Sequence, residues 1–594
     1  MKSNLQIAAI CPRVSVADTK TNAKNIIKLT KLAAQKGSQI IITPELSITG
    51  ATCGDLFLKP LLLENALKAL NTILKETKKL NTVLIVGLPL QVNTQLINVS
   101  AVLHKGKILG LVPAEICDKR YFTPAENLKY NGAFVFGKLI HFYPSTFKVF
   151  NTTFAVKTGL DLNEILPSMP GNVEIILNPS SHYEYLGKQE KLKTTISIYS
   201  FVQDCNYVYA SSAFGESSAE AVYSANDFIY DKGILVAEAP RLTMKEQVIT
   251  YKIGTKSKVK TTEQKYQKDK KHPFSPTNKK ELLEVLDLQA LALARRLEQT
   301  KISKVILGIS GGLDSTLALL AAVHTFKKLN LPLKNIFAYT LPGLGTTAKT
   351  KNNAEILCKA LGVTFEEIDI KPSVLQHFKD IKHNKNIVDT AYENAQARER
   401  TQILFDISNK IGALVLGTGD MSEFALGWAT YGGDHLSMYG INAGIPKTLI
   451  QEIVTEYAKT APAKISEVLK DILATPISPE LKPASRGKIT QKTEDLVGPY
   501  ILHDFFLYYF LVENLGPKEI YKLAYQTFKN DFKKAEIKHW LEVFFIRFFS
   551  QQFKRSCSPE GPKILQVSLS PRTDLRLPSD VSPALWFEEI KKLK

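Results

Sequence analysis

The sequence KVILGISGGLDS, residues 304–315, decides the fold of the C-terminal half of the chain. Its first half, residues 304–309, has the apolar character of a buried strand, and a helical pattern follows at residues 317–326. The glycine-rich turn at residues 310–315 lies between them. A strand, a tight loop and a helix place backbone N–H groups and a helix N-terminus together, where they can bind an anion. The sequence therefore predicts a phosphate-binding turn in an α/β domain.

The side chains of the turn fit this interpretation. Gly311 and Gly312 let backbone amides approach a pyrophosphate, Ser310 and Ser315 can donate hydroxyl hydrogen bonds, and Asp314 offers a hard oxygen to Mg²⁺. The lysine of the GxxxxGK[ST] loop is missing. The turn instead resembles the pyrophosphatase loop of the N-type ATP pyrophosphatases, which adenylate a carboxylate or carbonyl oxygen. The alternative is a serine- and glycine-rich turn that binds nothing.

Periodicity extends the α/β pattern in both directions. In the C-terminal half a helix is expected at residues 279–300, and further strands are expected at residues 335–340, 363–370 and 413–416. Helices between the strands predict a parallel sheet with right-handed crossovers. From residue 499 onward the sequence is typical of helices ending in a loop-rich tail. In the N-terminal half strands are expected at residues 39–43, 82–86, 173–177 and 207–210.

Composition is that of a soluble globular enzyme with 594 residues, 44% hydrophobic and 22% charged, enough for two or three domains. No apolar run reaches the roughly 18 residues that span a membrane; residues 505–512 predict a buried helix. Six cysteines without a CxxC pair favour a reduced, cytoplasmic protein. We predict one domain at residues 1–250, a Lys-rich linker at 251–278 and a second domain at 279–594.

The formal charge of +19 leaves several partners open, namely nucleic acid, a membrane surface or anionic small molecules. A Lys-rich solvated surface explains it equally well. The phosphate turn also leaves several enzymes open, including synthetases of GMP, asparagine and argininosuccinate, and tRNA-modifying ligases. Segments downstream of the turn are needed to choose among them.

Those downstream segments closely resemble the NAD synthetase family, in the version found in long, glutamine-dependent enzymes. The resemblance runs from about residue 301 to residue 580. It rests on LPGLGTT at 341–347, YENAQAR at 392–398, LGTGDMSE at 416–423, TYGGDH at 430–435, PKT at 446–448, QKTED at 491–495, QFKR at 552–555 and SPR at 570–572. It implies a Rossmann-like parallel-sheet ATP pyrophosphatase domain that amidates deamido-NAD to NAD through an adenylate, releasing AMP and pyrophosphate. Nucleic acid and membrane are then not expected as partners.

The resemblance also implies roles for individual residues. Attack of a carboxylate on the α-phosphate builds negative charge, so the site needs Mg²⁺ and a cation. The residues expected to bind ATP are Ser310, Gly311, Gly312, Asp314, Ser315, Thr418 and Lys447. Those expected to bind the dinucleotide are Asn394, Glu423, Asp434 and Lys554. Asp314 and Glu423 are the expected metal ligands, and Asp434 and Lys447 the expected catalytic groups.

Some of these residues have an alternative structural interpretation. Asp420 and Glu423 can face one crevice, but the same pair can form the N-terminal cap of a helix. Arg398 is a reserve candidate that could equally make a helix-surface ion pair. His435 is expected to be structural. The segment at residues 478–483 is expected to close over the site and protect the adenylate.

The N-terminal half resembles the nitrilase superfamily, which supplies ammonia from glutamine in long NAD synthetases. The resemblance covers about residues 5–248 and rests on TPELSITG at 43–50, DKRYF at 118–122, NPSS at 178–181 and Lys188. It implies an αββα sandwich. Nitrilase chemistry needs a cysteine, a glutamate base and a lysine. Of these only the glutamate, Glu45, is clearly present.

The nucleophile position of the nitrilase pattern falls on Gly159 when the aspartate of the motif is aligned on Asp161. The lysine position falls near Leu109, with Lys107 as a displaced possibility. We therefore predict a degenerate glutaminase, kept for folding or assembly of a homo-oligomer, and a ligase that uses ammonia, with glutamine doubtful. Two alternatives stay open. One is a glutamine-dependent enzyme with its nucleophile relocated to Cys53, Cys117 or Cys205; the other is a non-catalytic binding protein.

Overall fold

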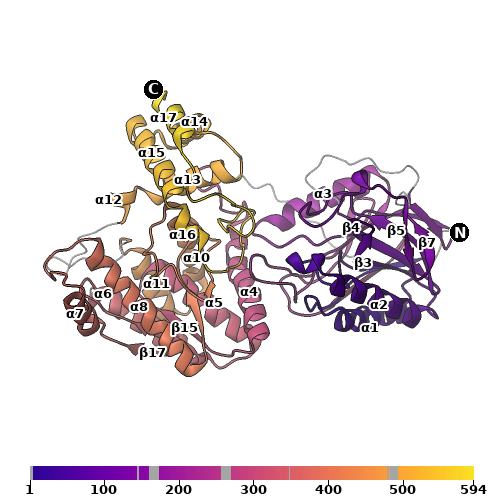
Figure 1. Cartoon of the computed structure of the whole chain (residues 1–594), viewed down its shortest axis with the longest axis horizontal. Helices are drawn as coiled ribbons and strands as arrows, with labels where there is room; N and C mark the ends of the chain where they lie inside the picture. Colours follow the sequence, from indigo (N-terminus) through magenta and orange to yellow (C-terminus); the bar gives the residue numbers. More distant parts are fainter. Residues whose placement is uncertain are drawn as a thin grey trace. The chain divides into compact units, whose positions relative to one another are not determined.

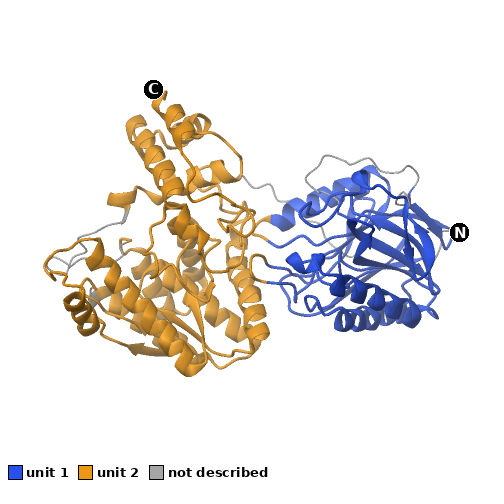
Figure 2. Ribbon diagram, viewed as in Figure 1, with its two compact units in different colours: residues 1–184, 188–217, 222–264 blue, residues 185–187, 218–221, 265–594 orange. Residues whose placement is uncertain are grey.

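The computed structural model describes residues 5–142, 146–159, 173–255, 269–346, 348–477, 481 and 493–593. The chain divides into two compact units (Figures 1 and 2). Unit 1 comprises residues 1–184, 188–217 and 222–264, and unit 2 comprises residues 185–187, 218–221 and 265–594. No helix among the described residues is long and apolar enough to cross a membrane.

Unit 1 contains two six-stranded sheets. The strands of the first, in spatial order, are β14 (Gln247–Lys252), β1 (Gln6–Cys11), β2 (Ile40–Ile42), β3 (Val83–Val92), β4 (Gln95–His104) and β5 (Lys107–Pro113). The strands of the second are β13 (Ile234–Glu238), β12 (Phe228–Asp231), β11 (Asn206–Ala210), β10 (Ile175–Pro179), β9 (Thr152–Val156) and β8 (Thr146–Val149). Every N-terminal strand expected from periodicity is present.

The layers of unit 1 follow from which faces of the sheets are apolar. One core forms between the sheets, where Ile7 and Val83 of the first meet Phe154 and Val208 of the second. On the outer face of the first sheet lie α1 (Thr19–Gln35) and α2 (Pro60–Thr77), and α3 (Lys188–Val202) covers the second. The unit is therefore the expected αββα sandwich.

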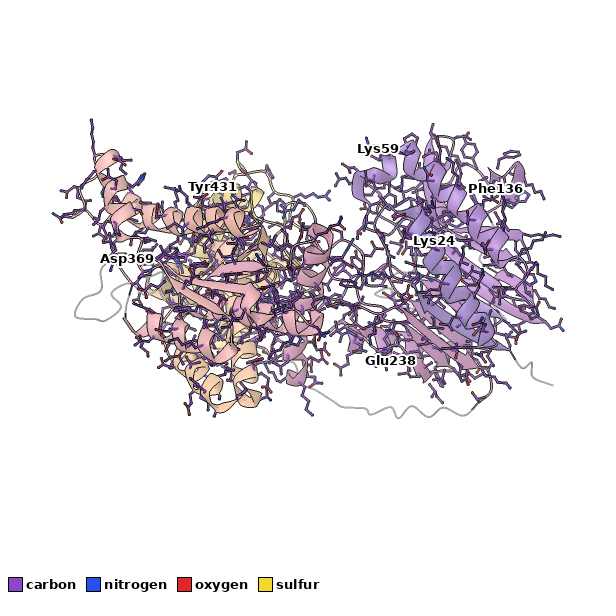
Figure 3. All side chains as sticks on the ribbon, turned by 90° about the horizontal axis from the view of Figure 1, so that it is seen from below. Lys24, Lys59, Phe136, Glu238, Asp369 and Tyr431 are labelled. Carbon is purple, nitrogen blue, oxygen red and sulfur yellow. The ribbon has the colours of Figure 1, made fainter. Side chains whose placement is uncertain are left out.

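A small hairpin projects from this sandwich. Its strands are β6 (Gly132–Val135) and β7 (Lys138–His141), and Phe136 at the turn is partly exposed (Figure 3). At the other end of the unit, β14 includes the first two residues of the segment expected as a linker, and residues 256–268 of that segment lie outside the described part of the chain.

Unit 2 is built on one parallel sheet, as predicted. Its strands, in spatial order, are β17 (Thr364–Glu367), β16 (Ile336–Thr340), β15 (Val305–Gly308), β18 (Leu414–Gly417) and β19 (Tyr439–Gly440). The chain proceeds from β15 outward to β17 and then returns to the other side of β15 with β18. In open α/β sheets the crevice beyond the carboxyl ends of strands at such a switch is where ligands bind. The loops that follow β15 and β18 meet there.

Helices surround this sheet. Before and between the strands lie α4 (Glu284–Thr300), α5 (Leu313–Leu329), α6 (Ala348–Leu361), α7 (Lys371–Asp380) and α8 (Thr390–Ile411). After β18 come α9 (Met421–Leu426), α10 (Lys447–Thr460), α11 (Ala463–Leu473) and α12 (Thr493–Val497). The side chains of α7 and α8 pack on one face of the sheet in a single apolar cluster with Ile306 and Val415.

The C-terminal helices form a subdomain of their own within unit 2. They are α13 (Tyr500–Leu511), α14 (Pro517–Phe528), α15 (Lys534–Ser550), α16 (Gln552–Ser556) and α17 (Ala584–Lys591). Aromatic rings in edge-to-face contact, such as Phe510 and Phe548, pack between α13 and α15. One expectation was wrong in part, because the loop-rich tail ends in α17. Trp586 of this helix packs on Phe549, an apolar contact too distant in sequence to be foreseen.

Candidate active site

The glycine-rich turn lies at the carboxyl end of β15 and leads directly into α5, whose N-cap is Gly312. Gly311 has a φ of +81°, and a Cβ at this position would lie 2.1 Å from the Thr350 carbonyl oxygen. Only glycine fits there. Ser310 Oγ accepts a hydrogen bond from Gly312 N at 3.1 Å and lies 3.1 Å from Ser315 Oγ. The turn is thus held in shape by its own serines at a helix N-terminus, as an anion site requires.

The loop after β18 supplies the first acidic residues of the site. Asp420 is the N-cap of α9, and its Oδ1 accepts a hydrogen bond from Glu423 N at 2.7 Å. Glu423 Oε2 in turn accepts a hydrogen bond from Asp420 N at 3.3 Å. The two residues form a capping box. The pair therefore caps the helix, which was its structural interpretation. It can also serve the site, because both carboxylates face Lys447.

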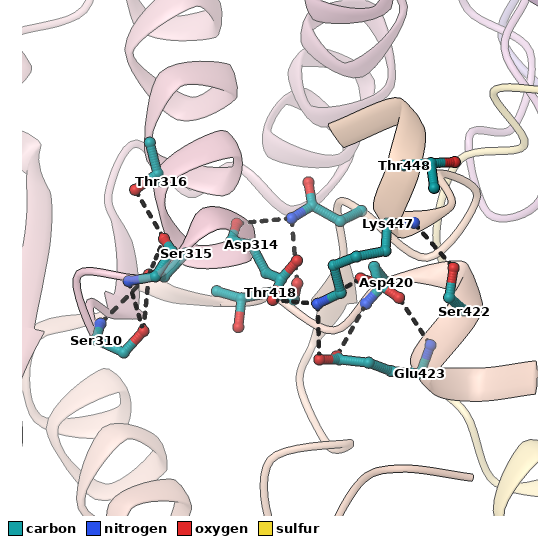
Figure 4. Close-up of polar contacts among 12 residues, drawn as sticks. Ser310, Asp314, Ser315, Thr316, Thr418, Asp420, Ser422, Glu423, Lys447 and Thr448 are labelled. Carbon is teal, nitrogen blue, oxygen red and sulfur yellow. Dashed lines mark hydrogen bonds and ion pairs between the residues drawn. The ribbon is translucent and has the colours of Figure 1, made fainter. Parts of the chain in front are cut away.

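Lys447, the first residue of α10, lies among three carboxylates, one from the start of α5 and two from the start of α9 (Figure 4). Its Nζ is 2.6 Å from Asp314 Oδ2, 2.7 Å from Asp420 Oδ2 and 3.0 Å from Glu423 Oε1. The ammonium is fully buried. One positive charge faces three acidic groups, so the cluster has room for more positive charge.

The buried position of this cluster shifts its pKa values. Burial raises the pKa of Asp420 well above its usual value and raises the pKa of Glu423 to about 7. Burial disfavours the ammonium of Lys447, but the carboxylates of Asp314, Asp420 and Glu423 outweigh it and raise the pKa of the lysine. Lys447 therefore stays charged, and a second cation would favour ionised carboxylates.

The donor atoms suit a magnesium ion. One oxygen from each of Asp314, Asp420 and Glu423 lies within 4.8 Å of the others, and Mg²⁺ prefers such hard oxygen ligands. Asp314 Oδ1 is buried and has no hydrogen-bond partner among the described residues. The sequence assigned Asp314 and Glu423 to the metal. The structure adds Asp420 to the same group.

A cavity of about 810 Å³ in unit 2 extends from the glycine turn past these acidic residues. All but one of the residues expected to bind ATP or the dinucleotide line this cavity. They are Ser310, Gly312, Asp314, Ser315, Asn394, Thr418, Glu423, Asp434, Lys447 and Lys554. Gly311 is not among the lining residues and packs against Thr350. The volume is in the range of cavities that bind small molecules.

Far from the glycine turn in sequence, polar contacts along this cavity join α8 and α16 to the loop at residues 427–434. Asp434 Oδ1 accepts a hydrogen bond from Thr430 N at 2.6 Å, and Thr430 Oγ1 donates one to Asn394 Oδ1 at 2.9 Å. Lys554 Nζ donates to the carbonyl oxygens of Gly427 and Ala429, both at 2.7 Å. Burial raises the pKa of Asp434 and lowers the pKa of Lys554.

The structure also places His435, Arg398 and part of the segment at residues 478–483. His435 is buried, stacks on Tyr431 with ring centroids 5.3 Å apart, and has its Nδ1 3.0 Å from the Thr430 carbonyl oxygen. Arg398 Nε donates to the Tyr431 carbonyl oxygen at 3.1 Å and is exposed. In the segment at residues 478–483, only Leu481 belongs to the described residues, so closure over the site lies outside them.

Two residues that sequence reasoning missed organise the site. Asn442 Nδ2 donates to the carbonyl oxygens of Asp314 at 2.8 Å and Thr418 at 3.1 Å, and so connects the glycine turn to the loop after β18. Asp504, on α13, accepts hydrogen bonds from the first turns of α9 and α10. The only sequence signal for Asp504 is a carboxylate in the apolar run that forms α13.

In unit 1, Glu45 lies in a buried polar cluster. Its carboxylate accepts hydrogen bonds from Asn98 Nδ2 and, at 2.9 Å, from Ser181 Oγ. Two further hydroxyls, Ser100 Oγ and Thr158 Oγ1, are 2.6 Å apart. Ser100 lies on β4 with Asn98, and Thr158 directly precedes Gly159. Burial raises the pKa of Glu45.

Gly159, at the predicted nucleophile position, is closed off by backbone. It has a φ of +67°, and a Cβ there would lie 2.0 Å from the Ile116 carbonyl oxygen. The segment that approaches it is held by two hydrogen bonds, from Ile116 N to the Gly159 carbonyl at 3.1 Å and from Glu115 N to the Thr158 carbonyl at 3.0 Å. This backbone has no room for a cysteine at residue 159.

The candidate replacement cysteines are in surroundings that favour the neutral thiol. Burial raises the pKa to about 12 for Cys53, about 11 for Cys117 and about 12 for Cys205. A catalytic thiolate needs the opposite shift. The pKa shifts of all three thiols are therefore in the direction that disfavours a nucleophile.

The lysines of unit 1 are also accounted for. Lys107 is exposed at the start of β5, and Leu109 packs on the apolar core between the sheets. Lys188 Nζ donates to the Tyr183 carbonyl oxygen at 2.7 Å and lies 3.6 Å from Glu184. The buried Lys157 forms an ion pair with the exposed carboxylate of Glu115. Among the described residues, the position aligned with the catalytic lysine is therefore occupied by the apolar Leu109.

Comparisons with known proteins cover both units. The family model described as NAD synthase matches residues 285–539, and the one described as carbon-nitrogen hydrolase matches residues 6–253. The glutamine-dependent NAD(+) synthetase of Mycobacterium bovis is 32% identical, with 99% of this chain and 98% of the relative covered. That of Mycobacterium leprae is 31% identical with the same coverage.

Solved structures share the fold. The glutamine-dependent NAD(+) synthetase of Cytophaga hutchinsonii aligns with a TM-score of 0.81 at 20% identity, covering 99% of this chain and all of that one. The enzyme of the same name from Acinetobacter baumannii, in complex with ADP, aligns with a TM-score of 0.65 at 21% identity, covering 97% of this chain and 98% of that one.

Proposed function

The chain belongs to the glutamine-dependent NAD(+) synthetase family of ligases, and we propose that it amidates deamido-NAD with ATP through an adenylate. We further propose that ammonia is its nitrogen source. The products are NAD, AMP and pyrophosphate. The observation that carries the ligase step is the cluster of Lys447 with Asp314, Asp420 and Glu423 beside the glycine turn.

In the first step the nicotinate carboxylate attacks the α-phosphate and pyrophosphate leaves. Ser310, Gly311, Gly312 and Ser315, with Thr418 opposite, hold the phosphates through the turn and the N-terminus of α5. Lys447 faces the charge that develops on the phosphoryl oxygens. Asp314 and Glu423 would hold Mg²⁺, which neutralises part of that charge when bound.

In the second step ammonia attacks the acyl-adenylate, a C–N bond forms and AMP leaves. Ammonium must first lose a proton, and the carboxylate of Asp434 is suited to accept it because burial raises the pKa of this group. Asn394, Glu423, Asp434 and Lys554 line the cavity and would hold the dinucleotide. The connection from Asn394 through Thr430 to Asp434 fixes the two polar groups relative to each other.

The nitrogen source follows from unit 1. A nitrilase-type glutaminase forms a thioester through a cysteine, and residue 159 has neither the thiol nor the space for one. The raised pKa values of Cys53, Cys117 and Cys205 argue against a relocated nucleophile. We infer that the nitrilase-like domain, residues 1–250, is a degenerate glutaminase and that Glu45 is vestigial. Residues 279–594 form the ligase domain, and residues 251–278 connect them.

The retained domain would then serve folding or assembly. The outer side of α3 carries exposed apolar side chains, with Ile198, Phe201 and Val202 at least half exposed. Exposed apolar groups of this kind mark protein contacts more often than free surface. A homo-oligomer is the assembly that we propose.

Two assays test this function. Pyrophosphate release should require both deamido-NAD and ATP; no release would favour a non-catalytic binding protein. The rate of NAD formation with ammonium chloride should greatly exceed the rate with glutamine, and added glutamine should yield no glutamate.

A second candidate is a fully glutamine-dependent enzyme, which the names of relatives that are 32% identical over nearly the whole chain favour. The same experiment separates the two. Glutamine-driven NAD formation that disappears on replacing Cys53, Cys117 or Cys205 by alanine would establish this candidate and overturn the ammonia proposal.

A further inference from the structure

Asp504 lies on α13, outside the cavity, and is 1% exposed. Its Oδ1 accepts a hydrogen bond from Ser422 Oγ at 2.5 Å. Its Oδ2 accepts two, from Thr448 N at 2.9 Å and Thr448 Oγ1 at 2.7 Å. One buried carboxylate thus joins two helices that are distant in sequence.

Both of those helices meet Asp504 at their N-termini. Ser422 is the second residue of α9 and Thr448 the second residue of α10. The first turn of a helix has N–H groups without partners and a positive end of the helix dipole, and a carboxylate stabilises both. The N-cap of α10 is Pro446, whose side chain makes no capping hydrogen bond. Asp504 supplies that cap from another helix.

The same hydrogen-bond network reaches Lys447. Ser422 Oγ, while donating to Asp504, accepts a hydrogen bond from Lys447 N at 2.8 Å (Figure 4). The neighbour of Ser422 in α9 is Glu423, whose Oε1 is 3.0 Å from Lys447 Nζ. Every residue that Asp504 holds therefore adjoins one member of the charged cluster.

We propose that Asp504 is a positioning residue of the ligase reaction: it fixes the starts of α9 and α10 so that Lys447 and Glu423 keep their places at the phosphates. This inference rests on the proposed function. Asp504 itself does not line the cavity, and its hydrogen bonds come from Ser422 and Thr448, the chain neighbours of Glu423 and Lys447. Its effect on catalysis must therefore pass through Lys447 and Glu423.

The test uses D504N in the full-length chain. Asparagine keeps the shape and can accept from Thr448, but its amide group then points at Ser422 Oγ and can no longer accept the serine proton. Because small displacements of catalytic groups have large effects, kcat should fall roughly 10- to 100-fold while the KM for deamido-NAD stays within about twofold. S422A, which removes the bridge from Asp504 to Lys447 N, should show the same split.

A double-mutant cycle shows whether Asp504 acts through the lysine. In a K447M background, D504N should change kcat and the Kd for MgATP, measured by titration calorimetry, by less than about twofold, because the group it positions is already gone. S408A serves as the control. Ser408, on α8, has a buried hydroxyl that donates to the Ala413 carbonyl oxygen, and neither residue belongs to the charged cluster. It should leave kcat unchanged.

Several results would overturn the proposal. Equal multiplicative losses from D504N in wild-type and K447M backgrounds would show a general structural effect, as would a loss in S408A matching that in S422A. Wild-type kcat in both D504N and S422A would also refute it. If the wild-type chain itself released no pyrophosphate with deamido-NAD and ATP, the proposed function would fail instead.

Discussion

Lys447 is fully buried and has three acidic neighbours, so its position depends on the charge of its ammonium as well as on packing. Replacing it by methionine keeps the volume and removes the ammonium. We expect K447M to lower kcat by about 100- to 1000-fold, as the loss of one preorganised group facing transition-state charge does. K464M, at an exposed lysine on α11, is the control. Pyrophosphate release measures both, and a K447M rate within threefold of wild type would refute the role of the lysine.

Gly159 offers a second prediction about a single residue. G159C restores the thiol of the nitrilase pattern, but the new Cβ overlaps the Ile116 carbonyl oxygen. We expect no glutaminase activity and a loss of about 2 kcal/mol or more in the free energy of unfolding, because both strain and overlap must be relieved. Glutamate release and urea unfolding measure the two effects.

A matched control exists in the same unit. Gly137 has a φ of +75° and open space around its Cβ position. G137C carries the same backbone strain without the overlap and should lose less stability than G159C. Glutamate production by G159C, or equal stability of the two variants, would show that the segment at residues 114–116 yields easily and that the site is not closed.

At the scale of elements, α13 joins the sheet domain to the C-terminal helices through two buried polar residues, His503 and Asp504. His503 Nε2 donates to the Val497 carbonyl oxygen at 2.5 Å, and its ring stacks on Phe544. Burial lowers the pKa of His503 to about 4 from a usual 6.5. The helix is therefore packed around a neutral imidazole.

This packing predicts a pH-dependent stability. Above pH 6.5 the histidine is neutral in both states and its contribution is constant. Between pH 6.5 and about 4 the unfolded chain binds the proton and the folded chain does not, so stability falls with falling pH. At pH 4.5 the loss should be roughly 2–3 kcal/mol. H503Q, which cannot be protonated, should lose that much less between pH 7 and pH 4.5.

Urea unfolding at the two pH values measures this difference. H539Q provides the comparison, since His539 on α15 is exposed. It should keep the wild-type dependence on pH. An H503Q protein with the wild-type loss of stability would show that His503 is not buried in the neutral form.

For the whole molecule, the two units should respond differently to ligands. We expect MgATP to bind the folded ligase unit and so to raise the melting temperature, by an amount equivalent to about 2.7 kcal/mol at a concentration 100 times its Kd. Glutamine should leave the melting temperature unchanged if, as we propose, the nitrilase-like unit is a degenerate glutaminase whose backbone leaves no space for a side chain at Gly159. Differential scanning calorimetry provides the measurement.

The control for this experiment is D314N, which removes one of the carboxylates expected to hold the metal and should reduce the shift caused by MgATP. A glutamine-dependent rise in the melting temperature would contradict a closed pocket in unit 1. It would also favour the glutamine-dependent candidate.

The sequence by itself predicted the class of each unit and several of its strands and helices in their order, but not α17. Residues 304–315 could be interpreted because a strand, a glycine turn and a helix start depend on neighbours in the chain, and the parallel sheet followed from alternation of strands with helices. The family followed from ordered motifs. The hypothesis of a missing nucleophile at Gly159 came from the absence of a cysteine at the aligned position.

Only the tertiary structure decided which side chains meet. No local signal identifies the partners of Asn442 and Asp504, because these partners are many residues away and are brought close by the sheet order and by α13. Likewise, alignment found glycine at residue 159, but only the folded backbone shows Ile116 occupying the space of a side chain. Contacts between distant segments depend on the packing of whole elements, and no periodicity or motif in the chain encodes the distance between them.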